Sequence, residues 1–342
     1  MKKILVTGVS GFIGGHIALY GLKNGYKVFG TVRNKNKEKE IKKTLKKYLT
    51  EEQIANLFIL EADLMKPDKW DEVTKNIDGL FHVASPFVLG IPKDENDLIK
   101  PARLGVKHVF EAAIKNKVDR IIQTSSTVAI IHGHSKDKEV FDETSWTNLE
   151  GEKTISPYIK SKTLAEQDVW KYVKENSQLK VTTINPSFVL GPILGEDVGT
   201  SGEVILKLMK GKYPAVPKLG FPTVDVRDVA KLHYLAFENN VSINQRYIAS
   251  SSSIWFKTMA EYILEAYPQL SSKIKAKELP NFFVKIFSLF DPSTKSIIPE
   301  LGFKPELINK KAKDDFNFDF ISVKDATIAT AKSFIEQKII QI

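Results

Sequence analysis

A tyrosine and a lysine stand four residues apart in the stretch ISPYIKSKTLAEQDVWKYV, which covers positions 155–173. Tyr158, Ala165, Val169 and Tyr172 are spaced to share one side of a 3.6-residue helix, and Lys162 falls on that side. A lysine among groups that should be buried needs a partner or a function. A cation one helical turn from a phenol favours phenolate and lowers the tyrosine pKa. Such a phenol can protonate a carbonyl oxygen as hydride arrives, or remove an alcohol's proton in reverse.

Two local features position this pair and supply a further hydroxyl. Ser156 and Pro157 suit the N-cap and first position of a helix, so the pair lies in its first turns. The segment DRIIQTSSTVAI reads as a buried strand with hydroxyls at its carboxyl end. Ser125 or Ser126 could hydrogen-bond a substrate oxygen beside the tyrosine, and the spacing alone does not choose between them.

A glycine turn near the amino terminus predicts a dinucleotide site. VTGVSGFIGGH places Gly8, Gly11 and Gly14 directly after the first predicted strand and at the start of a helix. The glycines permit a tight turn, close approach of a pyrophosphate and close packing of the helix on the sheet. Peptide N–H groups, including those of Phe12 and Ile13, then face the phosphates together with the helix dipole.

The end of the second predicted strand indicates which dinucleotide binds. NAD enzymes commonly place an acidic residue there, whereas NADP enzymes place arginine or lysine for the 2′-phosphate. The sequence reads GTVRNKNKEK, with Arg33 at that position and no acid before Glu38. Arg33 can bind phosphate through two N–H groups, and Lys37 or its neighbouring lysines can assist. NADP(H) is therefore the predicted cofactor, with a surface arginine beside a basic helix as the alternative.

The composition of the 342 residues limits the other possibilities. The absence of cysteine excludes disulfides and thiolate sites. Much of the formal charge of +9 lies in one run, from Lys35 to Leu49, where Ile41 and Leu45 form part of an apolar stripe. This pattern favours the solvated face of a surface helix over a nucleic-acid patch. The HGHSK segment has no further ligand at an obvious spacing, so no metal site is predicted.

The amino terminus superficially resembles a signal peptide, with two lysines followed by apolar residues. Glycines interrupt this apolar run, and no stretch reaches the ~18 uninterrupted apolar residues of a membrane span. We therefore expect a cytoplasmic protein that binds neither membrane nor nucleic acid.

The order of the predicted elements indicates an α/β fold. Apolar strands alternate with helices through the first half of the chain, which is typical of a parallel sheet covered on both faces. Prolines then mark an irregular region beyond position 186. We predict a Rossmann doubly wound parallel sheet of about seven strands with a smaller C-terminal substrate lobe. The nucleotide-binding domain is assigned to 1–186 with 223–250 returning to it, and the lobe mainly to 187–222 and 251–342.

Taken together, the motifs resemble the extended short-chain dehydrogenase/reductase superfamily. The stretches that carry the resemblance are VTGVSGFIGGH, TVR, ADL, FHVASPF, TSS, YIKSKTLAE, INPSFVLGP and DVRDVA. They are similar to the branch that contains dihydroflavonol 4-reductases, cinnamoyl-CoA reductases and yeast-type methylglyoxal or aldehyde/ketone reductases. The match runs from the first strand to about Ser250.

The resemblance implies roles for individual residues. Ser126, in preference to Ser125, would be catalytic, with Tyr158 as the general acid and Lys162 as its partner. The residues implied to border the cofactor are Asp63 and Leu64 at the adenine, Val83, Ala84 and Ser85 along its length, and Pro186, Ser187 and Val189 at the nicotinamide. The nicotinamide would deliver hydride to the substrate carbonyl.

Departures from the plant enzymes of this branch indicate the substrate class. Plant flavonoid reductases have an asparagine a few residues after the catalytic serine, where this sequence has Ile130 and Ile131. The longer signature of cinnamoyl-CoA reductases around the tyrosine is also missing. A reductase of small aldehydes or ketones, monomeric or homodimeric, is the prediction by elimination. Phe87, Ile131 and Phe221 are candidates for the pocket wall.

Two other functions remain open at this stage. A nucleotide-sugar epimerase or dehydratase shares the glycine turn and the Y-x-x-x-K pair but usually holds NAD tightly, which Arg33 and the HVASPF segment argue against. A non-catalytic NADP-sensing protein is ranked lower, because such proteins lose the tyrosine or lysine that this chain retains.

Overall fold

The computed structural model describes residues 1–85, 94–135, 137–151, 155–288 and 297–342. At its centre is one seven-stranded sheet, in which every neighbouring pair of strands is parallel. Its spatial order is β3 (Leu57–Glu61), β2 (Lys27–Val32), β1 (Lys3–Val6), β4 (Gly79–His82), β5 (Arg120–Thr124), β7 (Lys180–Pro186) and β11 (Gln245–Ala249). The predicted parallel α/β sheet of about seven strands is therefore confirmed.

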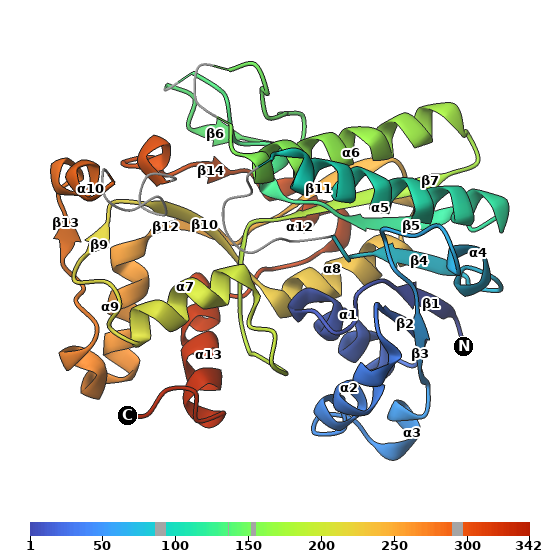
Figure 1. Ribbon diagram of the computed structural model, residues 1–342, viewed down its shortest axis with the longest axis horizontal. Helices are drawn as coiled ribbons and strands as arrows, with labels where there is room; N and C mark the ends of the chain where they lie inside the picture. Colours follow the sequence, from blue (N-terminus) through green and yellow to red (C-terminus); the bar gives the residue numbers. More distant parts are fainter. Residues whose placement is uncertain (86–93, 136, 152–154, 289–296) are drawn as a thin grey trace.

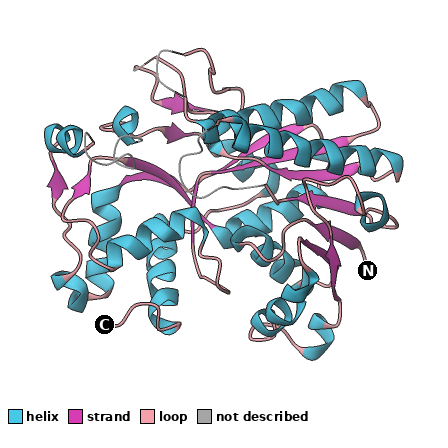
Figure 2. Cartoon of the chain, viewed as in Figure 1, coloured by secondary structure: helices cyan, strands magenta, loops and turns pink. Residues whose placement is uncertain are grey.

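Helices cover both faces of the sheet (Figures 1 and 2). On one face, α1 (Phe12–Lys23) packs against α8 (Val226–Glu238), and their apolar side chains join a large core with those of the sheet. On the other face, α5 (Asn96–Lys115) packs along α6 (Pro157–Glu175) over a second core. Strands β4 and β5 are buried at every position because they lie between these two layers.

The direction of strand addition reverses at β1. Val6 of β1 pairs with Gly30 of β2 on one side and with Phe81 of β4 on the other. The chain adds β2 and β3 outward in one direction, and then returns to add β4 and β5 in the other. In sheets of this kind ligands bind at the carboxyl ends of the strands beside such a switch point. The turn after β1 and the segment after β4 meet there.

A smaller lobe is built mainly from later parts of the chain, on the left of Figure 1. Its three-stranded sheet contains β12 (Ser252–Trp255), β10 (Gly220–Asp225) and β8 (Phe188–Leu190). Helix α13 (Val323–Glu336) contacts both α7 (Gly199–Met209) and α9 (Phe256–Ala266). Two short parallel pairs complete the sheets: β13 (Glu278–Leu279) with β9 (Val216–Pro217), and β14 (Glu306–Leu307) with β6 (Val140–Phe141).

The remaining described helices are short. The α-helices are α2 (Glu38–Leu45), α3 (Glu51–Ile54), α4 (Trp70–Val73), α10 (Asn281–Phe287) and α12 (Lys310–Phe316). The 3-10 helices are η1 (Lys35–Lys37), η2 (Thr127–Ala129), η3 (Asn240–Ser242), η4 (Pro268–Ser272) and η5 (Ile298–Glu300). Among the described helices none combines the length and apolar character required to cross a membrane.

Two of these short helices have a local explanation. Helix α4 covers only four residues, because Lys69 before it and Asn76 after it adopt left-handed backbone conformations at φ 69° and 57°. The basic run contains the eight-residue α2, whose Ile41 and Leu45 are buried while its lysines face solvent. This arrangement agrees with the solvated-helix interpretation of the charge.

Candidate active site

The glycine turn joins β1 to α1 with space for main chain only. A Cβ on Gly14 would lie 2.3 Å from the Gly8 carbonyl oxygen, so no side chain fits at that position. Gly8 has φ +71°, and a Cβ there would meet the Cβ of Ala84 at 2.8 Å. The turn therefore holds the start of α1 close to the segment after β4. The first backbone N–H groups of α1 have no partner within the helix and can bind an anion.

One of these N–H groups already binds an anionic oxygen of the protein. The carboxylate of Asp197 accepts a hydrogen bond from the backbone N–H of Phe12 at 3.0 Å, and its second oxygen accepts from Gly199 N–H at 2.9 Å. The start of α1 is thus arranged for an anion, and its donors fit a dinucleotide pyrophosphate. Asp197 was not predicted from the sequence, because no local motif links it to Phe12 of the glycine turn, 185 residues earlier.

Arg33 follows β2 at the same edge of the sheet. Its side chain is exposed and has no hydrogen-bond or ion-pair partner within the described part of the chain. Lys37, at the end of η1, is also exposed. Two exposed cations after β2 fit the additional phosphate of NADP better than the bare ribose of NAD.

The segment after β4 is held against β1 by one threonine. The hydroxyl oxygen of Thr7 accepts from the backbone N–H groups of Val83 at 2.9 Å and Ala84 at 2.8 Å, and it lies 3.1 Å from Nδ1 of His82. Burial, with a smaller contribution from the charge of Lys162, lowers the pKa of His82 to about 3. His82 is therefore neutral at physiological pH. The three residues that follow it are half-buried beside the glycine turn: Val83, Ala84 and Ser85.

The predicted adenine residues lie farther along this edge, after β3. Asp63 is half-buried and Leu64 is buried. One carboxylate oxygen of Asp63 accepts from Met65 N–H at 2.9 Å, which fixes the loop and orients the carboxylate. No bond to the side chain's other oxygen is present among the described residues, so that oxygen can accept from a ligand amino group.

Ser126, Tyr158 and Lys162 lie together at the carboxyl end of β5 and the start of α6. Ser156 caps α6 through its hydroxyl, which accepts from Ile159 N–H at 3.3 Å, as the sequence predicted. The side chains of Ser126 and Tyr158 are hydrogen-bonded to each other. Ser125 differs, because its hydroxyl donates to the buried carboxylate of Glu166 at 2.5 Å. Ser126 is thus the serine that faces the phenol.

Lys162 is half-buried and has no hydrogen-bond or ion-pair partner among the residues that the structure describes. Burial lowers its pKa to about 8. A lysine held in this way keeps its three N–H donors available for a ligand such as a ribose. Lys162 is therefore a candidate to bind a ligand at this site.

The expected lowering of the tyrosine pKa is wrong. The pKa of Tyr158 is raised above 10.0, because burial disfavours the charged phenolate. The hydrogen bond with Ser126 acts in the opposite direction but is the weaker influence, and Lys162 is not among the groups that shift this pKa. The phenol is consequently protonated at neutral pH, which is the form that donates a proton.

The predicted nicotinamide residues lie where β7 passes into β8. Pro186 and Val189 are buried, and Ser187 is half-buried. Ser187 donates both its backbone N–H and its hydroxyl to the Ala249 carbonyl, at 3.0 and 3.3 Å. These bonds fix the segment beside the carboxyl end of β7.

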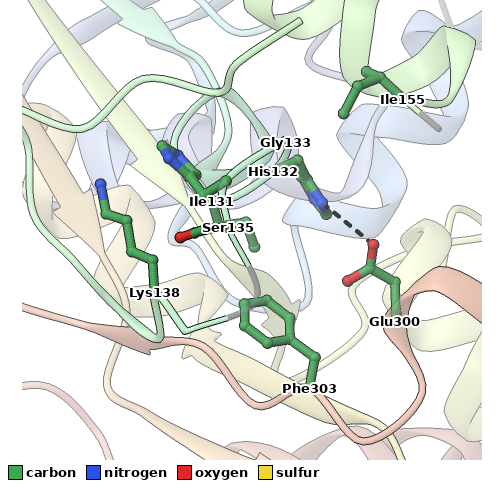
Figure 3. Close-up of a pocket in the computed structure, with 9 residues that line it drawn as sticks. Ile131, His132, Gly133, Ser135, Lys138, Ile155, Glu300 and Phe303 are labelled. Carbon is green, nitrogen blue, oxygen red and sulfur yellow. Dashed lines mark ion pairs between the residues drawn. The ribbon is translucent and has the colours of Figure 1, made fainter. Parts of the chain in front are cut away.

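The predicted pocket residues have three different outcomes. Phe87 lies outside the described residues. Ile131 lines a small cavity between the loop after η2 and the lobe, where His132 Nδ1 lies 3.4 Å from a carboxylate oxygen of Glu300 (Figure 3). Phe221 packs against Phe188, with ring centroids 4.5 Å apart, and is therefore part of an aromatic cluster in the lobe.

The histidines of the HGHSK segment have protein partners. His132 faces Glu300 as described above, and the Nε2 of His134 lies 2.9 Å from the Ile130 carbonyl oxygen. Within the described ranges no group of three or more His, Cys, Asp or Glu side chains is arranged to hold a metal ion.

A doubly wound parallel sheet with this glycine turn defines the class of dinucleotide-binding α/β proteins. The chain belongs to the NAD dependent epimerase/dehydratase family, whose sequence model matches residues 4–249. The resemblance to the extended short-chain dehydrogenase/reductase superfamily is thereby confirmed. The branch is also confirmed, since curated relatives include cinnamoyl-CoA, dihydroflavonol and methylglyoxal reductases.

Three comparisons illustrate the similarity. Tetraketide alpha-pyrone reductase 1 of Arabidopsis thaliana is 32% identical over 88% of this chain and 90% of its own length. NADPH-dependent methylglyoxal reductase GRE2 of Saccharomyces cerevisiae is 31% identical over 97% and 98%. The crystal structure of yeast methylglyoxal/isovaleraldehyde reductase Gre2 complexed with NADPH superimposes with a TM-score of 0.82 at 28% identity, covering 98% of this chain and 99% of that one.

Proposed function

We propose that this protein uses NADPH to reduce small aldehydes and ketones to alcohols. The observation that carries the proposal is the hydrogen-bonded Ser126–Tyr158 pair at the carboxyl edge of the sheet, with Tyr158 one helical turn before Lys162, whose ammonium has no partner among the described residues. At the level of reaction class the chain is an oxidoreductase, because its relatives over nearly their whole length are named reductases. NADPH is the cofactor, in agreement with the structural neighbours that hold it.

Each site residue has a separate role in carbonyl reduction. Bound NADPH supplies the hydride that reaches the carbonyl carbon. Tyr158, protonated at neutral pH, donates its proton to the carbonyl oxygen as negative charge develops there. The Ser126 hydroxyl orients the phenol and can donate to the same oxygen. Lys162 would hold the nicotinamide ribose through its N–H donors.

The lobe has a separate role in this proposal. We assign substrate binding mainly to residues 187–222 and 251–342, and cofactor binding to 1–186 with 223–250. The cavity beside Ile131 supports this division, because it is lined both by the loop after β5 and by Glu300 and Phe303 of the later chain.

The test is a spectrophotometric assay of the purified protein. NADPH and NADH oxidation would be followed separately with methylglyoxal, short aldehydes, diketones and ketones, and with a flavonoid and a cinnamoyl thioester as large comparison substrates. We expect oxidation of NADPH with the small carbonyl compounds. If neither cofactor were oxidised and NAD were released on denaturing the protein, a nucleotide-sugar epimerase would replace this proposal.

A further inference from the structure

The most highly connected buried carboxylate of the site belongs to Glu166. It lies on α6, two helical turns after Tyr158 and one after Lys162, and its side chain is fully buried. One oxygen accepts from Arg246 Nε at 2.7 Å, from Thr183 Oγ1 at 3.2 Å and from Trp170 Nε1 at 3.3 Å. The other accepts from Ser125 Oγ at 2.5 Å and from Asn185 Nδ2 at 2.7 Å.

Two of these donors are direct neighbours of residues in the proposed site. Ser125 precedes Ser126 at the end of β5, and Asn185 precedes Pro186 at the end of β7. Asn185 Nδ2 also donates to the backbone carbonyl of Ser126 at 3.2 Å. The carboxylate on α6 therefore holds the main chain of Ser126 from two sides, through its preceding residue and through an amide bonded to its carbonyl.

Arg246 continues the network to the far edge of the sheet. This β11 residue is buried, with 8% of its side chain exposed, and its Nη1 donates to the carbonyls of Glu143 and Ser145, both at 2.7 Å. Its guanidinium stacks on the Trp146 ring at 3.9 Å. Glu166 thus connects α6 with β5, β7 and β11.

A buried ion pair of this kind is not explained by stability alone. Desolvation of the two charges offsets much of their attraction, and apolar residues of similar volume often stabilise a fold equally well. The Glu166 carboxylate of this pair instead links the helix that carries Tyr158 to the strand end that carries Ser126, through Ser125 and Asn185. Fixed directional bonds at that junction set the distance between the two hydroxyls, which apolar contacts would leave less well defined.

We propose that Glu166 is a positioning residue for the reaction, whose carboxylate fixes Ser126 relative to α6 so that the serine meets the Tyr158 phenol. This inference rests on the proposed carbonyl reductase function. It predicts that weakening the network lowers turnover through misplacement of Ser126, with less effect on NADPH binding, which depends mainly on the glycine turn and Arg33. Misplacement of about 1 Å can cost a hundredfold in rate.

The main test compares Glu166→Gln with the wild type. Glutamine keeps the shape of the side chain, but it replaces one acceptor oxygen by an NH₂ group that faces a donor. We expect kcat to fall roughly ten- to a hundredfold, with the NADPH dissociation constant changed less than about threefold. Ser125→Ala removes only the bond next to Ser126 and should lower kcat roughly several-fold.

The pH dependence of alcohol oxidation with NADP⁺ separates positioning from general damage. The phenolate of Tyr158 accepts the alcohol proton in that direction, and its hydrogen bond with Ser126 lowers its pKa. Loosening Ser126 should therefore move the rising limb of the profile to higher pH, by roughly half to one unit. Lys162 on the same helix is unchanged in these variants, and His82 on β4 remains neutral throughout this range.

Arg120→Met is the matched control. Arg120 is also a buried arginine of this sheet, but it lies at the amino end of β5, where it donates to the Lys180 carbonyl at 2.9 Å and to Thr182 Oγ1 at 3.0 Å. Its replacement should lower the melting temperature and leave both kcat and the pH profile unchanged.

Each outcome decides the inference. The positioning role is supported if Glu166→Gln and Ser125→Ala both lower kcat and shift the pH profile to higher pH. Arg120→Met must show neither effect. The positioning role is overturned if both network variants keep the wild-type kcat and pH profile. It is also overturned if all three variants lose kcat equally without a shift of the pH profile. If Glu166→Gln did not fold, Ser125→Ala against Arg120→Met would decide alone. No turnover by the wild type would instead overturn the proposed function, and this inference with it.

Discussion

Lys162→Met is expected to give a more stable but less active protein. Burial lowers the pKa of Lys162 from 10.5 to about 8, which means that the fold disfavours the charged amine. Each unit of pKa corresponds to about 1.36 kcal/mol, so a shift from 10.5 to about 8 reduces the free energy of unfolding at neutral pH by at most about 3 to 4 kcal/mol. Lys162 is only half-buried, and solvent screening reduces this penalty. We expect Lys162→Met to raise the free energy of unfolding by about 1 to 3 kcal/mol at about pH 7.

The sign of the pH dependence follows from the same pKa values. Between about pH 8 and 10.5 the unfolded chain binds the lysine proton and the folded protein has released it, so wild-type stability rises with pH across this window. The advantage of Lys162→Met should therefore be largest below about pH 8 and should disappear by about pH 10.5.

Urea denaturation of the wild type and variants at several pH values measures this difference. Lys160→Met is the control, because Lys160 lies on the same helix but pairs at the surface with Glu95 at 2.7 Å. Its replacement should change stability by less than about 1 kcal/mol. The prediction is wrong if Lys162→Met is no more stable than the wild type at neutral pH, or if its advantage in the free energy of unfolding grows with pH.

Two further predictions concern cofactor binding. Arg33→Ala should raise the KM for NADPH roughly ten- to a hundredfold and leave that for NADH nearly unchanged, because one charge-assisted phosphate contact is lost; equal losses in steady-state kinetics would remove the basis for assigning NADPH to Arg33. Asp197→Asn should tighten NADPH binding roughly two- to fivefold in a fluorescence titration, because the carboxylate on Phe12 N–H competes with the pyrophosphate. Weaker binding in Asp197→Asn would show that this carboxylate supports the cofactor site instead.

Local patterns predicted the parts of the fold that depend on nearby residues. The strand–glycine–helix order around Gly8 and the spacing of Tyr158 and Lys162 each lie within one supersecondary unit, so the sequence carries them directly. The short length of α4 depends on left-handed backbone at Lys69 and Asn76, which sequence spacing does not reveal.

Features that join distant parts of the chain were not predicted. The Glu166–Arg246 pair connects residues 80 positions apart, and Asp197 reaches α1 across 185. Only tertiary packing brings these groups together. The direction of the Tyr158 pKa shift was wrong for a related reason, since spacing reveals the neighbouring lysine but not how deeply the phenol is buried.

The proposed function requires Tyr158 to deliver the proton during NADPH-dependent carbonyl reduction. The most direct test measures NADPH oxidation by the wild type and Tyr158→Phe with the best small aldehyde, together with the NADPH dissociation constant of each protein. We expect kcat to fall roughly a hundredfold to ten thousandfold, with NADPH binding unchanged within about threefold. A Tyr158→Phe protein that turned over at the wild-type rate would contradict it.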